Sequence, residues 1–527
     1  MMKLPGVLMF LLVLGTAESA CNSTCSTFCD CSNHGLTSVP RDLPTNITRL
    51  DLQHNQITTV GQLDFSRYRS LITLDLGYNR ISTIGSQAFY QLSNLTKLRV
   101  SSNSLRNLTA SMFTGLANVQ EMIFYKNDIS DIQTGTFNPT PLLIRLLVHR
   151  NKLTSLKSGM FSGLENLQEL WVNDNEITNI QTGTFNSTSE LRILSLSQNK
   201  LATLRSDMFT DLKGLKYLYL YDNDITSIHA GAFSSTSQLG ILHLYNNHIQ
   251  SIPSNLLSNL LQLSDLKLSY NNLTDFPFEQ LSNVQTISTL KLDNNKMTTL
   301  PSLAYDILSS ISDVNIDNNP WQCDCRMVDF KLKITESSPF ENRITCSQPD
   351  NLSGLKLKDI KLENLFLGCL EPKIVRFERS GNVKLLQGAN ILEQVVCEAT
   401  GIPTPTITVI PPAGLNTTAE SNGIVTVEEN SNVIIQNIIA ADAGLYGCIA
   451  SSPIGSTFAV LSTEVVNPVS PPRFTLPVFA GSVSGAVAGT IAIGAIILAI
   501  WCRARAKTRF VALSTESDVD LTTVTQL

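Results

Sequence analysis

The sequence predicts a curved solenoid of parallel strands with a cysteine-containing cap at each end, followed by an all-β sandwich and one membrane-spanning helix. Two ladders of equal period carry the solenoid prediction. A fixed period of 20 to 50 residues is typical of solenoids, because each repeat must bury its apolar face against the next. An asparagine returns every 24 residues, at Asn55, Asn79, Asn103, Asn127, Asn151, Asn175, Asn199, Asn223, Asn247, Asn271, Asn295 and Asn319. A phenylalanine returns with the same spacing, at Phe65, Phe89, Phe113, Phe137, Phe161, Phe185, Phe209 and Phe233.

The pattern within each repeat predicts which side chains face the core. An apolar alternation such as Leu74-Asp75-Leu76 stands ahead of each asparagine, and the pattern L-x-x-L-x-L-x-x-N-x-L resembles that of leucine-rich repeats. The resemblance implies a leucine-rich-repeat α/β solenoid, a horseshoe of parallel strands, over residues 46–319. With the asparagine at repeat position 9, we expect positions 1, 4 and 6 to point inward and the phenylalanines to stack across the same core. The asparagine amides should bond the backbone of the adjoining coil.

The two ends of the chain carry segments typical of a membrane protein. Residues 1–20 combine an early lysine, an apolar run and small residues, as secretory signal peptides do. Residues 478–502 contain no charge and are long enough to cross a bilayer, and a basic cluster beginning at Arg503 follows at once. We therefore predict a single-pass type I protein of the plasma membrane with its N-terminus outside. A stalk would occupy 468–477 and a cytoplasmic tail 503–527.

Ten cysteines precede the predicted span, an even number for an oxidising compartment. Zinc binds clustered cysteines in some proteins, but exported cysteine-rich modules are usually held by disulfides. We therefore expect disulfides and no metal or other cofactor. The first two groups define an N-terminal cap at 21–45 and a C-terminal cap at 320–370. The groups are Cys21, Cys25, Cys29 and Cys31; Cys323, Cys325, Cys346 and Cys369; and Cys397 with Cys448.

Both caps resemble those of extracellular leucine-rich-repeat proteins. At the C-terminal end the resemblance is carried by Asn319-Pro320-Trp321-x-Cys323-x-Cys325, and it implies the pairs Cys323–Cys346 and Cys325–Cys369. At the N-terminal end four cysteines precede the entry segment Gly35-Leu36-Thr37-Ser38-Val39-Pro40. Four cysteines allow three connectivities; analogy with the family favours Cys21–Cys29 with Cys25–Cys31.

Residues 371–467 leave the repeat and read as short β-rich runs. The motifs Cys397-x-x-x-Gly401-x-Pro403 and Asp442-x-Gly444-x-Tyr446-x-Cys448 resemble those of I-set immunoglobulin domains. The resemblance implies a two-sheet sandwich joined by Cys397–Cys448, with Tyr446 in a tyrosine corner. Val409 stands where the family has a core tryptophan, which should thin the core and leave more of the stability to the disulfide.

Repeat positions 3, 5, 7 and 8 should project onto one face, the concave face of the solenoid. Its ends carry charges such as Asp51 and Lys291, while its middle is apolar and aromatic. Strands favour aromatic and β-branched residues in any case. An exposed patch of this kind nevertheless marks a protein-binding site more often than chance, and the row from Ile123 to Trp171 has no expected core role. We predict partner binding by Ile123, Tyr125, Leu147, His149, Trp171, Tyr217, Tyr219, Tyr221, His243 and Tyr245.

Eight N-x-Ser/Thr sequons precede the predicted span, which fits an extracellular location. None falls on a concave strand position, so we expect that face to stay free of glycans. The expected glycosylation sites are Asn22, Asn46, Asn94, Asn107, Asn186, Asn272, Asn351 and Asn416.

The membrane span and tail contain two short motifs. Gly481, Gly485 and Gly489 form a tandem G-x-x-x-G, which lets two helices approach closely in lipid, although glycine is common in spans generally. The chain ends Thr525-Gln526-Leu527, which resembles a class I PDZ ligand. We predict a homo-oligomer through the span and a cytoplasmic PDZ protein as partners.

The order of modules resembles the leucine-rich-repeat and immunoglobulin-like domain single-pass transmembrane family, which contains adhesion molecules and receptors. It implies cell-surface recognition of an extracellular or cell-surface protein. The repeats are also similar to those of innate immune receptors, so binding of a microbial ligand is the alternative. The formal net charge of −6 without an extracellular basic stripe argues against nucleic acid. The six histidines are scattered and show no acid–base or metal spacing, so we do not expect an enzyme.

Overall fold

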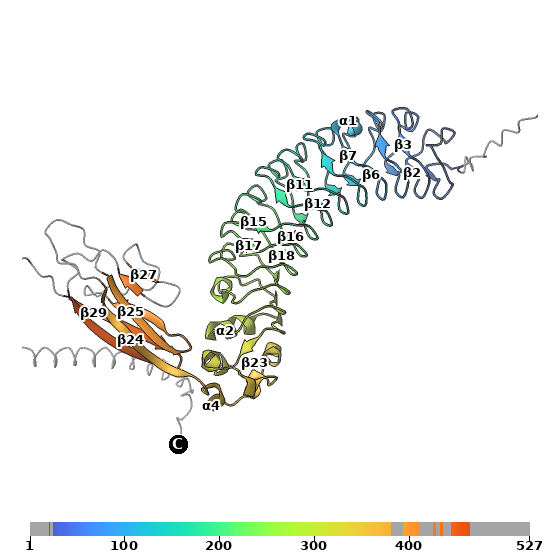
Figure 1. The fold of residues 1–527 in the computed structure, drawn as a ribbon. Coiled ribbons are helices and arrows are strands. Elements are labelled where there is room, and N and C mark those ends of the chain that lie inside the picture. The colour runs from blue at the N-terminus through green and yellow to red at the C-terminus, as the bar shows by residue number, and fades with distance from the viewer. Residues whose placement is uncertain are drawn as a thin grey trace, which may run out of the picture.

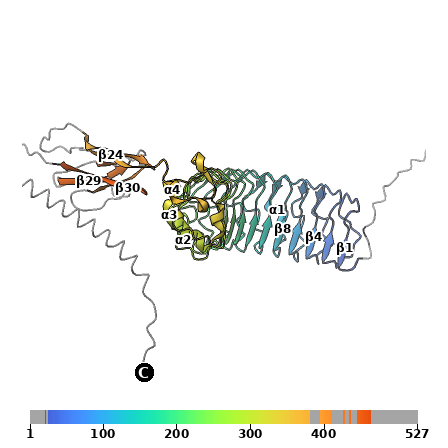
Figure 2. The same cartoon turned by 90° about the horizontal axis from the view of Figure 1, so that it is seen from below.

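The computed structural model describes residues 21, 25–380, 394–410, 425–427, 433–435 and 444–463. Its dominant feature is a thirteen-stranded parallel sheet that lines the inner side of an arc of stacked coils (Figure 1). The strands lie side by side in chain order, as β1, β4 and β8 show in Figure 2. They are β1 (Phe28–Asp30), β2 (Arg49–Asp51), β4 (Thr73–Asp75), β6 (Lys97–Arg99), β8 (Glu121–Ile123), β10 (Arg145–Leu147), β12 (Glu169–Trp171), β14 (Ile193–Ser195), β16 (Tyr217–Tyr219), β18 (Ile241–His243), β19 (Asp265–Lys267), β20 (Thr289–Lys291) and β21 (Asp313–Asn315).

Strand register within the repeats equals the sequence period. Leu194 pairs with Leu218, and Leu218 with Leu242, so equivalent residues form straight columns across the sheet. The leucines in the middle of these strands are fully buried, because the middle residue of each three-residue strand points into the core. The predicted parallel-strand solenoid is therefore confirmed.

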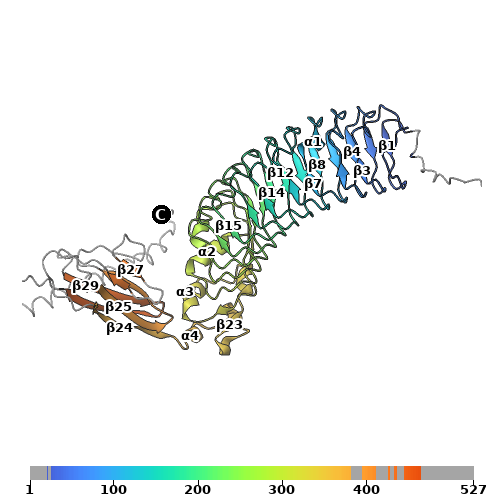
Figure 3. The same cartoon turned by 45° about the horizontal axis from the view of Figure 1, so that its top comes forward.

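The outer side of the coils differs from the expected α/β arrangement. It consists mainly of turns and two-residue strands paired with the next coil, several of which are visible in Figure 3. Only α1 (Ala110–Phe113) and α2 (Ser302–Ser310) are α-helices between residues 46 and 319. Segments such as Gln181-Thr-Gly-Thr-Phe-Asn-Ser-Thr are too short and too rich in Gly, Thr and Asn to nucleate a helix. The outer strands are β3 (Thr59–Val60), β5 (Thr83–Ile84), β7 (Asn107–Leu108), β9 (Asp131–Ile132), β11 (Ser155–Leu156), β13 (Asn179–Ile180), β15 (Thr203–Leu204) and β17 (Ser227–Ile228).

The two sequence ladders occupy the interior as expected. The phenylalanines are buried and stack in pairs, with ring centroids 6.1 Å apart for Phe161 and Phe185. Each repeat asparagine bonds backbone groups of two coils. Asn175, for example, accepts the amide N–H of Leu153 at 3.0 Å and donates to the carbonyls of Val148 at 3.2 Å and Val172 at 3.0 Å. The ladder thus satisfies buried backbone groups that the strands leave unpaired.

The residue before each asparagine adopts a left-handed conformation, with φ between 52° and 58°. None of these residues is glycine, so the Asn bonds must hold a turn that the backbone alone disfavours. The residues are His54, Tyr78, Ser102, Lys126, Arg150, Asp174, Gln198, Asp222, Asn246, Tyr270, Asn294 and Asn318.

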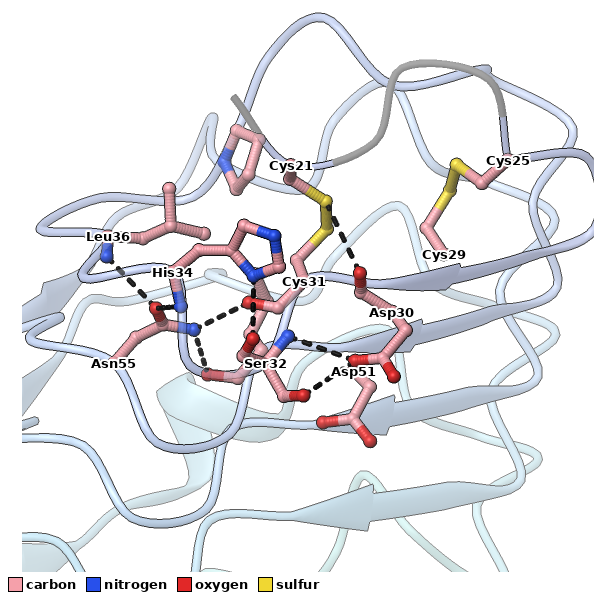
Figure 4. The surroundings of a disulfide bond; sticks show 12 residues. Cys21, Cys25, Cys29, Asp30, Cys31, Ser32, His34, Leu36, Asp51 and Asn55 are labelled. Atoms are coloured by element: carbon pink, nitrogen blue, oxygen red, sulfur yellow. Dashed lines mark hydrogen bonds between the residues drawn. A yellow bond between two sulfur atoms is a disulfide. The ribbon is translucent and has the colours of Figure 1, made fainter. Parts of the chain in front are cut away.

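The N-terminal cap continues the sheet through β1 and is joined to the first coil by Asn55, whose amide donates to the Cys31 carbonyl at 2.8 Å (Figure 4). Its disulfides are Cys21–Cys31 and Cys25–Cys29. The expected pairing of Cys21 with Cys29 and of Cys25 with Cys31 is therefore wrong. Cys21 lies beside the end of β1, 3.9 Å from the carbonyl of Asp30, and so reaches Cys31, while the turn from Cys25 leads back to Cys29.

The C-terminal cap closes the other end of the core with the fully buried Trp321. Its disulfides, Cys323–Cys346 and Cys325–Cys369, are the pairs implied by the family resemblance. The cap and the coils before it contain η1 (Phe278–Leu281), β22 (Trp321–Gln322), η2 (Cys325–Met327), α3 (Val328–Lys331), η3 (Pro339–Arg343), β23 (Cys346–Gln348), η4 (Asp350–Leu352), η5 (Leu357–Asp359) and α4 (Leu362–Leu365).

After the cap, the described strands form two antiparallel sheets, with orders β24-β25-β28-β27 and β26-β29-β30. The disulfide Cys397–Cys448 joins β25 to β29 and therefore links the sheets. Val409 is 2% exposed and packs with Tyr446 and this disulfide, in the place where the sequence resemblance led us to expect tryptophan. The strands are β24 (Leu370–Ser380), β25 (Gln394–Ile402), β26 (Thr406–Ile410), β27 (Val425–Val427), β28 (Val433–Ile435), β29 (Gly444–Ser452) and β30 (Gly455–Thr463).

Several sequence predictions fall outside the described residues. These are the signal peptide at 1–20, the stalk at 468–477, the span at 478–502 with Gly481, Gly485 and Gly489, and the tail with Thr525, Gln526 and Leu527. Within the described ranges, no helix combines the length and apolarity needed to cross a membrane.

Candidate interaction surface

The inner sheet presents three columns of side chains, at repeat positions 3, 5 and 7. Position 5 forms the middle column, because the register pairs Leu147 with Trp171, Trp171 with Ser195 and Ser195 with Tyr219. Positions 3 and 5 open and close each strand, and position 7 follows two residues later. Neighbouring members of a column are separated by one strand spacing, about 4.8 Å. Side chains from many coils therefore form one continuous face.

Of the ten predicted binding residues, nine are half-buried on this face: Tyr125, Leu147, His149, Trp171, Tyr217, Tyr219, Tyr221, His243 and Tyr245. Ile123 differs, because it is only 2% exposed between Arg99 and Leu147 and offers almost no surface to a partner. Trp171 and Tyr219 do not belong to the solenoid's buried core.

The aromatic side chains contact one another across the strands. Trp171 and Tyr219 come from strands that are not adjacent, yet their ring centroids lie 6.2 Å apart. Both rings cover Ser195, which stands between them and is 1% exposed. Tyr219 also meets His243 at 5.3 Å. A small residue at this point of the middle column lets two large rings close over it.

A second stack extends the surface along position 7, where Tyr221 and Tyr245 are parallel with centroids 4.6 Å apart. Two isoleucines at position 3, Ile193 and Ile241, are half-buried beside Tyr217. We name this set the aromatic block: Trp171, Ile193, Tyr217, Tyr219, Tyr221, Ile241, His243 and Tyr245.

Burial keeps two tyrosine hydroxyls of the block neutral. Burial, reinforced by the neighbouring Tyr221 and Asp222, raises the pKa of Tyr245 to about 12. Burial also raises the pKa of Tyr219. His243 lies 3.0 Å from the carboxylate of Asp265. Burial opposes ionisation of Asp265, but His243 and Lys267 outweigh it and lower the pKa of that carboxyl, so the carboxylate marks the charged edge of the block.

Charged side chains flank the block on the N-terminal side. Lys97 bonds Glu121 at 2.6 Å, Glu121 lies 3.4 Å from Arg145, and Arg145 bonds Glu169 at 2.8 Å. Glu169 in turn accepts the indole N–H of Trp171 at 3.4 Å. The positive and negative charges of this ladder alternate along position 3 and balance one another. Its last member, Glu169, orients Trp171 at the N-terminal edge of the block.

Polar atoms without partners concentrate on the same face. Tyr125 stacks on His149 at 4.9 Å, and the Nδ1 atom of His149 is buried without a hydrogen-bond partner. Burial, aided by Arg150, lowers the pKa of His149. The side-chain oxygen of Asn173 on the next coil is likewise buried and unpaired. An unpaired buried polar atom costs free energy, so these two atoms lower the stability of the coils that contain them.

The family described as Leucine rich repeat matches six overlapping segments of this chain, residues 45–105, 93–153, 141–201, 165–225, 189–244 and 219–273. These segments contain the strands that carry the aromatic block. Residues 45–273 of the chain are therefore leucine-rich repeats.

Curated relatives of this leucine-rich-repeat chain carry a second domain in their names. The Mus musculus leucine-rich repeat and immunoglobulin-like domain-containing nogo receptor-interacting protein 3 is 29% identical over 150 residues, which are 28% of this chain and 25% of the relative. The Homo sapiens leucine-rich repeat, immunoglobulin-like domain and transmembrane domain-containing protein 3 is 27% identical over 166 residues, 29% of this chain and 22% of the relative. The match thus spans a quarter or less of these relatives, and it supports the predicted resemblance to their family.

Among solved structures, the complex of latrophilin 3, Unc5D and the leucine-rich-repeat protein FLRT2 contains a chain that aligns with a TM-score of 0.48 and 24% identity. The alignment covers 65% of this chain and 97% of that one. A chain of the TLR13–ssRNA13 complex aligns with a TM-score of 0.46 and 22% identity, over 61% of this chain and 54% of that one.

Sequence reasoning missed four residues of this leucine-rich-repeat surface. Ile193 and Ile241 occupy position 3, the same column as the predicted Tyr217, so the repeat phase contained the signal. Glu169 and Asp265 act by contact with Trp171 and His243. Their role depends on side-chain reach between columns, which the repeat phase does not specify.

The predicted glycosylation sites can be placed on the coils in part. Asn272 is half-buried, while Asn22 and Asn416 lie outside the described residues. None of the placed sequons lies on positions 3, 5 or 7. The exposed ones are Asn46, Asn94, Asn107, Asn186 and Asn351.

Proposed function

We propose that this chain is a cell-surface recognition protein that binds another protein through the aromatic block of its solenoid. The observation that carries the proposal is that the concave positions of the coils of β14, β16 and β18 contain no Asp, Glu, Lys or Arg. Their nine residues at positions 3, 5 and 7 are isoleucine, serine, tyrosine and histidine only. Half-buried tyrosine and tryptophan are the side chains most enriched at the energetic centres of protein interfaces.

The surroundings of the block support a protein partner. The charged ladder before the block and the Asp265–Lys267 pair after it would form the polar rim that surrounds an interface centre and excludes water. The placed sequons lie off this face, so glycans would not obstruct it.

We further propose that residues 371–467 form an immunoglobulin-like domain and that residues 478–502 anchor the protein in the plasma membrane. The two sheets joined by Cys397–Cys448, with Tyr446 buried beside the disulfide, support the domain assignment. Relatives named for such domains support both parts. A cytoplasmic PDZ scaffold bound by the C-terminal residues and pairing of the spans belong to the same proposal.

Binding of the full-length chain to cultured cells tests the proposed surface. Cells that display the chain should adhere to cells carrying the partner. Trp171→Ala or Tyr219→Ala should each weaken this binding by about 2 kcal/mol, roughly thirtyfold. Tyr90→Ala is the matched control, because Tyr90 is 53% exposed but lies off the concave face. Unchanged adhesion by both concave variants would contradict the proposal. Binding of microbial wall material without cell contact would favour the immune alternative.

A further inference from the structure

One outward face of the β-sandwich carries no Asp, Glu, Lys or Arg. It belongs to the sheet of β26, β29 and β30, where exposure alternates along β30: Phe458 and Val460 are exposed, and Ala459 between them is half-buried. Residues directly opposite each other in an antiparallel pair share a face, so the register extends this set to the other two strands. We name it the neutral face, and it consists of every second residue of β26 from Thr406 to Ile410, of β29 from Leu445 to Ser451 and of β30 from Ser456 to Ser462.

The centre of the neutral face is apolar and nearly flat. Phe458 is 61% exposed and Val460 is 50% exposed. Val460 stands opposite Gly447, which has no side chain, and Gly447 stands opposite Ile410 on β26. An antiparallel sheet that faces water usually carries polar side chains on its outer side. Exposed apolar side chains in this position indicate that another surface covers the face.

The opposite sheet of the sandwich does not share this character. Arg376 on β24 bonds Glu378 at 2.7 Å and Glu398 at 3.2 Å, and all three side chains are partly exposed. Exposed charges of this kind are well solvated, so covering them gains little free energy. Removal of apolar surface from water therefore favours contact through the neutral face and not through the charged sheet.

The size of the neutral face restricts the kind of partner. Three strands about 4.8 Å apart and seven residues at about 3.4 Å each give an area of roughly 300 Å². Stable complexes between freely diffusing proteins bury about 800 Å² on each partner. A contact this small can hold only a partner that is already concentrated beside it, as is a copy of the chain anchored in the same membrane.

The composition of the neutral face favours the same occupant. A charged partner would lose hydration there without gaining an ion pair, so the partner must offer a flat and uncharged surface. A second copy related by a two-fold axis offers such a surface, because it presents the same face, and two-fold dimers are the commonest assemblies of identical chains. None of the eight sequons falls on the neutral face, so no expected glycan is attached to it.

We infer that two copies of this chain in one membrane pair through their neutral faces about a two-fold axis. The inference rests on the proposed anchoring of the chain. It concerns the sandwich, so the aromatic block stays available to a different protein. Because the face is only three strands wide, an axis through its centre places the two Val460 residues within about two strand spacings of each other.

Charge substitution at Val460 tests this pairing in the full-length chain displayed on cells. Dimers are trapped with an amine-reactive reagent that does not cross membranes, and two epitope tags identify dimers of unlike chains. Val460→Glu alone and Val460→Arg alone should each lower the dimer yield at least fivefold, because like charges meet across the axis. Co-expression of the two variants should restore the yield to within twofold of the unmodified chain. Val375→Glu is the matched control, because Val375 is 53% exposed on β24 of the other sheet, and it should leave the yield unchanged.

Restored yield in the mixture would exclude misfolding as the cause of the losses in the single variants. Losses without restoration would show that something other than a second copy covers the neutral face, and would overturn the inference. Unchanged yields in both single variants would assign self-association to another segment and would overturn it as well. Release of the chain into the medium would refute the proposed anchoring and the inference together, whereas anchored chains without dimers would refute the inference alone. The Trp171→Ala, Tyr219→Ala double variant should keep the full dimer yield, so the proposed concave surface is tested separately; a lower yield there would place the contact on that surface instead.

Discussion

Replacing Asn175 by alanine tests whether the asparagine ladder holds the solenoid together. Each position-6 carbonyl from Leu52 to Leu292 accepts from two asparagines. Val148 accepts from Asn151 at 2.9 Å and from Asn175 at 3.2 Å, and Val172 accepts from Asn175 and Asn199. These carbonyls therefore keep one partner in Asn175→Ala. The backbone N–H of Leu153, by contrast, loses the bond to Asn175 Oδ1 and lies in a buried part of the coil.

The cost follows from this inventory. A buried N–H without a partner costs about 1–3 kcal/mol, and the bonds lost to three carbonyls, those of Val148, Val172 and Asn173, add roughly 1 kcal/mol. Asn175→Ala should therefore lower the free energy of unfolding by about 3 kcal/mol. Asn166→Ala is the matched control: that asparagine is exposed and makes one bond, to the carbonyl of Pro141 at 2.9 Å. Its loss should cost under about 0.5 kcal/mol.

Urea unfolding of the full-length chain, followed by tryptophan fluorescence, measures both variants under identical conditions. A loss for Asn175→Ala no larger than that for Asn166→Ala would refute the account of the ladder. It would mean that the leucine columns alone hold the coils in register and that the buried N–H of Leu153 finds another partner.

Two further changes give distinct outcomes in thermal unfolding. Gly115→Ala should cost about 3 kcal/mol or more, because Gly115 has φ +98° and a Cβ there would lie 2.5 Å from the Tyr90 carbonyl oxygen. Gly354→Ala, with φ +82° and no atom within 4 Å of the new Cβ, should cost only about 1 kcal/mol, and equal losses would contradict the steric argument. Burial raises the pKa of Asp75 in the folded chain. The contribution of this carboxyl to the stability of the fold is therefore fully present below its unfolded pKa near 4, and it is lost as the pH rises through the folded pKa. Asp75→Asn should then have a higher Tm than the unmodified chain at pH 7 but not at pH 3; a lower Tm at pH 7 would show that the pair with Arg99 dominates.

The strict period is the reason that much of the fold can be predicted from the sequence. With a 24-residue register, the columns follow by counting, and counting alone assigns Trp171, Tyr219 and His243 to one column, as the strand register confirms. The same counting identifies the interior asparagines. Because the repeats are equivalent, the role of a position in one coil predicts the role of the same position in the next coil.

Interactions that break this order cannot be predicted in the same way. The contact between Trp171 and Tyr219 depends on the small side chain of Ser195 between them. The burial of Ile123 depends on the side-chain conformations of its neighbours. The pairing of the four cysteines within the eleven residues 21–31 depends on the path of the backbone, which their spacing does not specify.

The ladder of Asn bonds also restricts how a gene encoding this chain can change in length. The bonds of Asn175 join residues 22 and 27 positions apart, and the neighbouring asparagines repeat the same separations. Losing or duplicating one whole turn would restore all of them, whereas a shorter insertion inside a strand would leave donors and acceptors mismatched. Evolution can therefore lengthen or shorten the inner sheet only in steps of one strand spacing.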